Sequence, residues 1–138
     1  MRNTPKFILG AGAVALIVGS LAFSPQVAFA GGEMPSKKAC EAAKDNVTKG
    51  GCIATDRKKG NCMACHTFAG LEKTRLQAGN IAPPLLAMKT RYPDRAKLRK
   101  QVWDASSNNS STVMPPFGRH KVLSEKEIDL VVDWLQTL

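Results

Sequence analysis

The sequence predicts an all-α domain, because apolar residues recur at helical spacing and no segment shows the pattern of a strand. Several stretches after residue 31 place apolar side chains three and four positions apart, on one face of a helix. No stretch alternates apolar and polar residues with a period of two, and no internal repeat is visible. The 138-residue chain is long enough for one small domain after its N-terminal segment.

Residues 1–30 have the features of a secretory signal peptide. A short basic region precedes an apolar run over residues 7–23, and Ala28-Phe29-Ala30 offers small residues at the two recognition positions before a cleavage site. An uncleaved membrane anchor is the alternative, but the run is short for a spanning helix and contains glycines. We therefore expect cleavage before Gly31 and a periplasmic domain over residues 31–138, with no membrane span after cleavage.

The charge of the chain favours an acidic partner. The full sequence has a formal charge of +9, and removing residues 1–30 takes away two basic residues and no acidic ones, which leaves +7. A basic surface attracts acidic proteins or anionic substrates. Nucleic acid, the usual alternative for a basic domain, is not expected outside the cytoplasm.

Two helical segments are expected in the first part of the domain. Pro35-Ser36 opens a helix that continues to about Thr48, and Gly50-Gly51 is expected to stop it. A second helical segment is expected over about residues 52–59. Glycine and proline pairs then predict that residues 70–84 are mostly loop.

A further helix is expected after this loop. Pro93 suits a first helical position, and Leu98, Val102 and Ala105 in the following stretch share one face. Lysine and arginine residues between them are expected to point outward. Residues 106–112 are polar and are expected to form an exposed loop.

The last helix has the clearest signals. Ser124 and Glu127 have the spacing of a capping box, and Leu123 is placed to pack on Ile128 as a hydrophobic staple. The residues expected to face the core, with Trp134 beside them, are Ile128, Val131, Val132 and Leu135.

Cys62-Met63-Ala64-Cys65-His66 is the attachment signature of a c-type haem. In such a motif, the two thiols add to the haem vinyl groups and the adjacent imidazole becomes an axial ligand of the iron. A bare pair of cysteines at this spacing would also suit zinc or thioredoxin-like redox chemistry. The histidine that follows directly argues against both, and zinc would need a second ligand pair that the sequence lacks. We therefore expect one covalent haem c around which the helices are wrapped.

The second axial ligand has to come from elsewhere in the chain. Met114 is the best choice, because the neighbouring Pro115-Pro116 restricts the backbone and presents the thioether at low entropic cost. Methionine ligation raises the reduction potential relative to two imidazoles. A ligating histidine also needs a fixed acceptor for its other ring nitrogen, and either a carbonyl near Pro83 serves or that segment is a plain turn. The other candidates considered for the iron are Met34, Met63, Met88, His120 and a free cysteine.

Two cysteines remain outside the attachment motif. Cys40 and Cys52 form an even leftover pair, which in an oxidising compartment predicts a disulfide. A reactive or iron-ligating free thiol is the alternative.

The attachment motif, a proline segment after it, and a methionine loop before a closing helix follow one another along the chain. This order resembles the class I monohaem cytochromes c, and the sequences of the three segments resemble the SoxX family within that class. Residues 57–66 are similar to the SoxX haem-binding segment. Gly79-Asn80-Ile81-Ala82-Pro83-Pro84-Leu85 is similar to the segment that follows it, although Ala82 stands where glycine is usual. Met114-Pro115-Pro116-Phe117 and the final helix resemble the methionine loop and its closing helix. The resemblance implies that the Pro83 carbonyl accepts a hydrogen bond from His66 and that His66 and Met114 ligate the iron.

The resemblance also implies a function. SoxX is the electron-transfer subunit of SoxAX, an L-cysteine S-thiosulfotransferase that joins thiosulfate oxidatively to a cysteine of the SoxYZ carrier protein. The expected partners are therefore a SoxA-like cytochrome subunit in a heterodimer, a SoxYZ-like carrier and a soluble acceptor cytochrome, and no residue of this chain is expected to be catalytic. The alternatives are a free-standing periplasmic electron carrier to a terminal oxidase and a redox-inert structural subunit.

Overall fold

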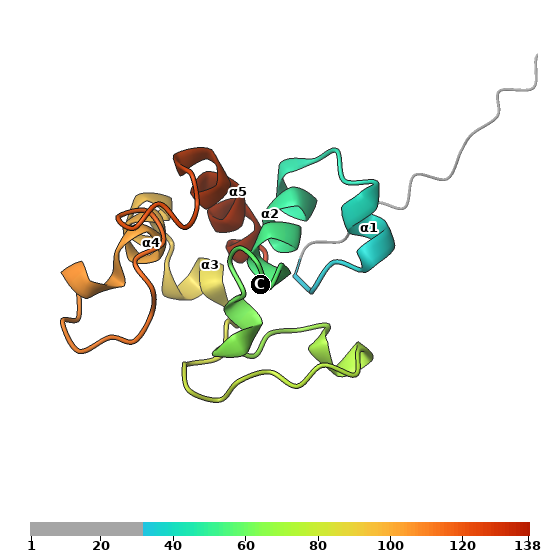
Figure 1. Ribbon diagram of the computed structural model, residues 1–138, viewed down its shortest axis with the longest axis horizontal. Coiled ribbons are helices and arrows are strands. Elements are labelled where there is room, and N and C mark those ends of the chain that lie inside the picture. Colours follow the sequence, from blue (N-terminus) through green and yellow to red (C-terminus); the bar gives the residue numbers. More distant parts are fainter. Residues whose placement is uncertain (1–31) are drawn as a thin grey trace, which may run out of the picture.

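The computed structural model describes residues 32–138, which form five α-helices and three short 3-10 helices (Figure 1). The α-helices are α1 (Lys37–Glu41), α2 (Asn46–Thr55), α3 (Met88–Arg91), α4 (Arg95–Trp103) and α5 (Glu125–Leu135). The 3-10 helices are η1 (Cys62–Ala64), η2 (Leu71–Lys73) and η3 (Ala105–Ser107). No strand occurs in this part of the chain, so the all-α prediction is confirmed. The expected signal peptide lies outside the described residues.

Helix α5 is the central element of the core. It packs along α2 and against α4 (Figure 1). Its N-terminus has the predicted capping box, in which the Ser124 hydroxyl accepts from the Glu127 N–H and the Glu127 carboxylate accepts from the Ser124 N–H. The predicted core face is buried, and the staple residues Leu123 and Ile128 are buried as well. Trp134, expected beside this face, is completely buried as well, with its ring edge-on to Phe68.

The predicted helix from Ser36 to Thr48 is wrong in its extent. Helix α1 ends at Glu41, and α2 begins after Asp45, whose carboxylate caps the Thr48 N–H at 2.8 Å. Gly50-Gly51 does not stop a helix but lies inside α2.

The two glycines are required by the close approach of α2 to α5. A Cβ atom on Gly50 would lie 1.9 Å from the carbonyl oxygen of Leu130, and one on Gly51 would lie 2.8 Å from the Trp134 Nε1. The two glycines lower the helix propensity of α2, but larger residues at these positions would push α2 and α5 apart. Helix α2 ends at Thr55, so the segment expected as far as residue 59 is helical only in its first turn.

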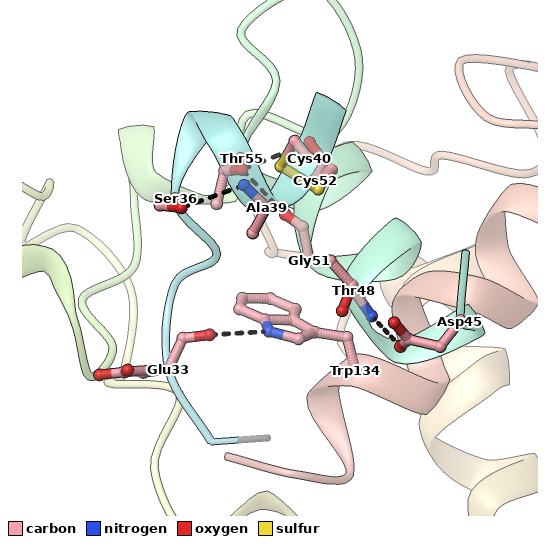
Figure 2. The surroundings of a disulfide bond; sticks show 10 residues. All are labelled: Glu33, Ser36, Ala39, Cys40, Asp45, Thr48, Gly51, Cys52, Thr55 and Trp134. Atoms are coloured by element: carbon pink, nitrogen blue, oxygen red, sulfur yellow. Dashed lines mark hydrogen bonds between the residues drawn. A yellow bond between two sulfur atoms is a disulfide. The ribbon is translucent and has the colours of Figure 1, made fainter. Parts of the chain in front are cut away.

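A disulfide between Cys40 and Cys52 joins α1 to α2, as the cysteine count predicted (Figure 2). Its neighbourhood ties the N-terminal segment to the core, because the Trp134 Nε1 donates to the Glu33 carbonyl at 3.1 Å (Figure 2). Helix α1 has five residues and no buried side chain. The disulfide therefore provides a covalent link that restricts its movement relative to α2.

Helix α4 begins two residues later than predicted. Asp94 is its N-cap and accepts from the Ala96 N–H at 2.8 Å, so Pro93 precedes the helix. Leu98, Val102 and Ala105 are buried as expected. The basic residues of α4 do not all point into solvent, since Arg99 is half-buried and its Nε donates to Asp129 of α5 at 2.9 Å.

None of the helices in residues 32–138 has the length and apolar character that crossing a membrane requires.

Candidate haem-binding site

The five residues expected to hold haem line one cavity. This cavity has a volume of about 740 Å³ and is bounded by the attachment segment, the proline segment, α3, α4 and the loop before α5. Cys62, Cys65, His66, Pro83 and Met114 all contribute to its lining. Residues up to 52 positions apart in the sequence are thus brought to one space by the fold.

The attachment segment is a single tight turn. The N–H groups of Cys65 and His66 both donate to the Cys62 carbonyl, at 3.2 and 2.9 Å. Asn61 starts the turn in the left-handed conformation, with a φ of 46°. The turn places both thiols and the imidazole on the cavity lining.

The chain after the motif folds back onto this turn. The Gly79 N–H donates to the Met63 carbonyl at 2.9 Å, and the Ala82 N–H donates to the Cys65 carbonyl at 3.1 Å. A Cβ on Gly79 would lie 1.9 Å from the Ala64 carbonyl oxygen, so glycine is needed for this close approach. The proline segment is therefore set at a fixed distance from the cysteines and the histidine.

The His66 ring has a fixed partner. Its Nδ1 lies 2.7 Å from the Pro83 carbonyl oxygen. Because a carbonyl only accepts, Nδ1 carries the proton and Nε2 is left with a free lone pair. The Pro83 segment is thus not a plain turn, and this contact fixes the tautomer that an axial ligand needs.

Two methionines line the cavity. Met114 is half-buried in the loop before α5, and its N–H donates to the Thr112 hydroxyl at 3.2 Å. Met88, in α3, is 3% exposed and also lines the cavity. The remaining candidate ligands, Met34, Met63 and His120, do not belong to this lining.

The cysteines of the motif are both unpaired. Burial raises the pKa of the Cys62 thiol to about 12, so this thiol is neutral at physiological pH. A reactive or redox-active cysteine has a lowered pKa instead. The site therefore does not have the electrostatics of a thioredoxin-like centre.

The cavity walls fit a haem. The interior is apolar, while basic residues stand at its rim: Arg57, Lys58, Lys59 and Arg91. Two unpaired cysteines suit covalent attachment, one imidazole whose Nδ1 is already hydrogen-bonded suits iron, and an apolar pocket suits the macrocycle. The apolar wall residues include Leu85, Met88, Leu98, Val102, Phe117 and Leu135.

The sequence allows Leu85 and Phe117 either to line the haem pocket or to form an exposed apolar patch, and the structure places both in the cavity wall. One lining residue was not foreseen from the sequence. Arg91 carries no motif and was not singled out, yet it lines the cavity beside the proline segment. Its only sequence signal is its position two residues before Pro93, which does not indicate a ligand.

Comparisons with known proteins agree with this arrangement. Residues 55–135 match the family described as "Cytochrome C oxidase, cbb3-type, subunit III". The crystal structure of SoxXA from P. pantotrophus includes a chain with 30% sequence identity and a TM-score of 0.59. The match covers 69% of this chain and 82% of that one. No curated protein sequence matches the chain.

The family match covers more than half of the chain and contains the whole attachment segment. The structural match extends the likeness to the arrangement of the helices. Cytochromes c act in electron transfer through a covalently bound haem c, for which this chain provides two unpaired cysteines and a histidine in one cavity. The chain therefore belongs to the cytochrome c family and is a SoxX-like electron-transfer cytochrome.

Proposed function

We propose that the chain is the electron-transfer subunit of a SoxAX-type L-cysteine S-thiosulfotransferase in the periplasm. The observation that carries the proposal is the 30% identity to a chain of SoxXA over 82% of that chain, with the haem-type cavity within the matched fold. In the proposed reaction, thiosulfate is joined to a carrier cysteine on a partner protein and two electrons are released. This chain accepts them one at a time and passes them to a soluble cytochrome.

The proposed site has one haem c with histidine and methionine ligation. Cys62 and Cys65 would anchor the haem as thioethers, and His66 and Met114 would ligate its iron. When bound, the haem supplies reversible one-electron oxidation and reduction. The Pro83 carbonyl keeps the Nδ1 proton of His66 in place, so Nε2 is the nitrogen available to the iron.

Met114 is preferred over Met88 as the second iron ligand because the two thioethers have different surroundings. Met88 is a buried wall residue in α3, and its Sδ accepts from an Arg91 Nη1 at 3.7 Å, so its thioether already has a polar partner. Met114 is half-buried in a loop between Thr112 and Pro115, and among the described residues its thioether accepts no hydrogen bond.

The surface near the cavity supports a permanent partner. Ile81 and Val113 are 69% and 74% exposed, and both belong to the cavity rim together with the exposed Val122. Leu85 and Phe117 do not belong to this exposed patch, because both are buried in the cavity wall. Exposed apolar residues beside a redox centre suit a lasting interface with a SoxA-like cytochrome in a heterodimer.

Basic residues at the cavity rim suit the two partners expected to bind transiently, the carrier protein and the acceptor cytochrome. The rim carries Arg57, Lys58 and Arg91, and the described residues keep the positive balance of the sequence. An acidic SoxYZ-like carrier or an acidic acceptor cytochrome would be steered toward this rim by long-range attraction.

A free-standing electron carrier to a terminal oxidase is the second candidate. It is favoured by one observation, the match to a family described by a subunit of a cytochrome c oxidase. The haem and its ligands would be the same, and the difference lies in the partner.

Native co-purification separates the two functions. The full chain, tagged at its C-terminus, is expressed in its own host, and proteins that leave the column in fixed ratio are identified by mass spectrometry. The proposal predicts a stoichiometric haem-bearing partner and reduction of the purified complex by thiosulfate in the presence of the carrier protein. A monomer that other cytochromes reduce and thiosulfate does not would refute the subunit function and support the carrier.

A further inference from the structure

We propose that Arg91 is a positioning residue for the axial histidine, acting through the Pro83-Pro84 segment. The proposal rests on the proposed function in one respect, that His66 is an iron ligand. Arg91 lies outside the attachment motif, the proline segment and the methionine loop, and it would be a further residue that influences the reduction potential of the haem.

Two successive carbonyl groups of the proline segment are held by two different side chains. The Pro83 carbonyl accepts from the His66 Nδ1 at 2.7 Å, and the Pro84 carbonyl accepts from the Arg91 Nη1 at 2.7 Å. Prolines have no N–H, so neither residue can anchor the segment by donating a backbone hydrogen bond. The Pro84 carbonyl shares its peptide group with the Leu85 N–H, which donates to the Thr67 carbonyl at 2.8 Å, so Arg91 and Thr67 hold this peptide group from opposite edges. The preceding Pro83-Pro84 peptide group has no N–H, and its carbonyl contacts only His66 among the described residues, so its orientation depends on the held peptide group next to it.

Hydrogen bonds at both ends of α3 hold the backbone of Arg91 in place. It is the last residue of α3, and the first residue of that helix, Met88, is buried and donates its N–H to the Leu138 carbonyl at 2.7 Å. The Gln136 side chain donates to the Tyr92 carbonyl at 2.8 Å on the other side of Arg91. Hydrogen bonds thus connect the C-terminal residues to α3, and Arg91 at the end of α3 to Pro84, the residue next to the partner of His66.

The physical consequence is a change in how strongly His66 donates electrons. A hydrogen bond from Nδ1–H to a carbonyl makes the imidazole a better donor to a metal at Nε2. Better donation favours the ferric state and lowers the reduction potential. If Arg91 holds the Pro83-Pro84 segment in place, its loss weakens this bond and raises the potential.

A simple charge effect has the opposite sign. A positive charge at the cavity favours the ferrous state, which carries one positive charge fewer, so removing a cation lowers the potential. The direction of the shift therefore distinguishes the positioning role of Arg91 from its charge.

The test compares Arg91→Met with Lys89→Met in the full holoprotein. Methionine keeps much of the length of either side chain but cannot donate a hydrogen bond. Lys89 is exposed in the same helix, so its replacement removes one positive charge and leaves the Pro84 contact intact. Arg91→Lys, which keeps the charge and one donor, measures rescue.

Two quantities are measured, the midpoint potential and the solvent exchange of the hyperfine-shifted His66 Nδ1 proton in the ferric protein. We expect Arg91→Met to raise the potential and to speed the exchange by about tenfold, which is the loss of one charge-assisted hydrogen bond. Lys89→Met should lower the potential slightly or leave it unchanged, with unchanged exchange, and Arg91→Lys should lie nearer the wild type.

A lowered potential in Arg91→Met, or exchange at the wild-type rate, would overturn the positioning role. If the wild-type protein shows no hyperfine-shifted His66 ring protons, the non-exchanging C–H protons included, His66 is not an axial ligand, and both this inference and the proposed ligation fail. Dependence on thiosulfate does not enter the measurement, so a wrong partner assignment leaves the result for Arg91 valid.

Discussion

Replacing Gly50 by alanine tests the close packing of α2 on α5. Helix propensity alone predicts that alanine stabilises the middle of a helix by about 1 kcal/mol relative to glycine. The structure predicts the reverse, because the added Cβ would lie 1.9 Å from the Leu130 carbonyl oxygen and 3.1 Å from the Trp134 Cβ. Ordinary contact begins at 3.4 Å, so the helices must separate by about 1.5 Å at this point.

The magnitude follows from setting the two effects against each other. Overpacking a core costs about 1–3 kcal/mol, and the upper end applies because the obstacle at Gly50 is backbone and cannot rotate away. Subtracting the propensity gain leaves a loss of about 2 kcal/mol in the free energy of unfolding. Urea unfolding of the holoprotein, followed by far-ultraviolet circular dichroism, should show a midpoint lower by about 1 M.

Gly51→Ala is the matched comparison. Its Cβ would meet side-chain atoms, the Trp134 Nε1 at 2.8 Å and the Pro35 Cδ at 2.9 Å, which can move more easily than backbone. We expect a smaller loss, about 1 kcal/mol. If Gly50→Ala is as stable as the wild type, or more stable, the helix contact is looser than described and the explanation for the two glycines fails.

The remaining predictions concern caps, charges and the disulfide. Ser124→Ala should cost about 1 kcal/mol in urea unfolding, because it removes the N-cap of α5, and an unchanged midpoint would contradict the capping role. The hydrogen bond from Lys59, with those from Ser124, lowers the pKa of Glu127 to about 2, below its ordinary 4.5. Its carboxylate therefore stabilises the fold above pH 4.5 and loses this effect between pH 4.5 and 2. Relative to Glu127→Gln, the wild type should show an advantage of at most about 1 kcal/mol at pH 6 that vanishes near pH 2, whereas a pH-independent difference would exclude the ion pair as its source. Replacing both Cys40 and Cys52 by serine opens a loop with a sequence separation of 12 and should cost about 3 kcal/mol, and unchanged thermal unfolding would show that α1 contributes nothing through this bond.

Elements with local signals were predicted well from the sequence. The capping box of α5 depends on two residues three positions apart, and its core face depends on spacing within one helix, so both are visible without a partner element. The Cys40–Cys52 pairing followed from the even number of cysteines outside the attachment motif, together with the expectation of an oxidising compartment. The attachment motif likewise specifies its chemistry in five consecutive residues.

Features that depend on a distant partner were not predictable in this way. Gly50-Gly51 has the sequence of a helix stop, and its true function depends on Leu130 and Trp134, some 80 residues later. Helix α4 begins two residues later than predicted because the capping hydrogen bonds of Asp94 outweigh the preference of Pro93 for a first helical position. Arg91 donates to a backbone carbonyl, and a backbone acceptor leaves no residue type by which a sequence pattern can reveal the pair.

Far-red absorption of the ferric protein tests the proposed ligation of one haem iron by His66 and Met114. Ligation of ferric iron by methionine gives a characteristic band in this region. Ligation by Met114 predicts the band in the wild type and in Met88→Leu, and its absence in Met114→Ala, together with a lower reduction potential. A band that persists in Met114→Ala and disappears in Met88→Leu would contradict it and assign the sixth ligand to α3.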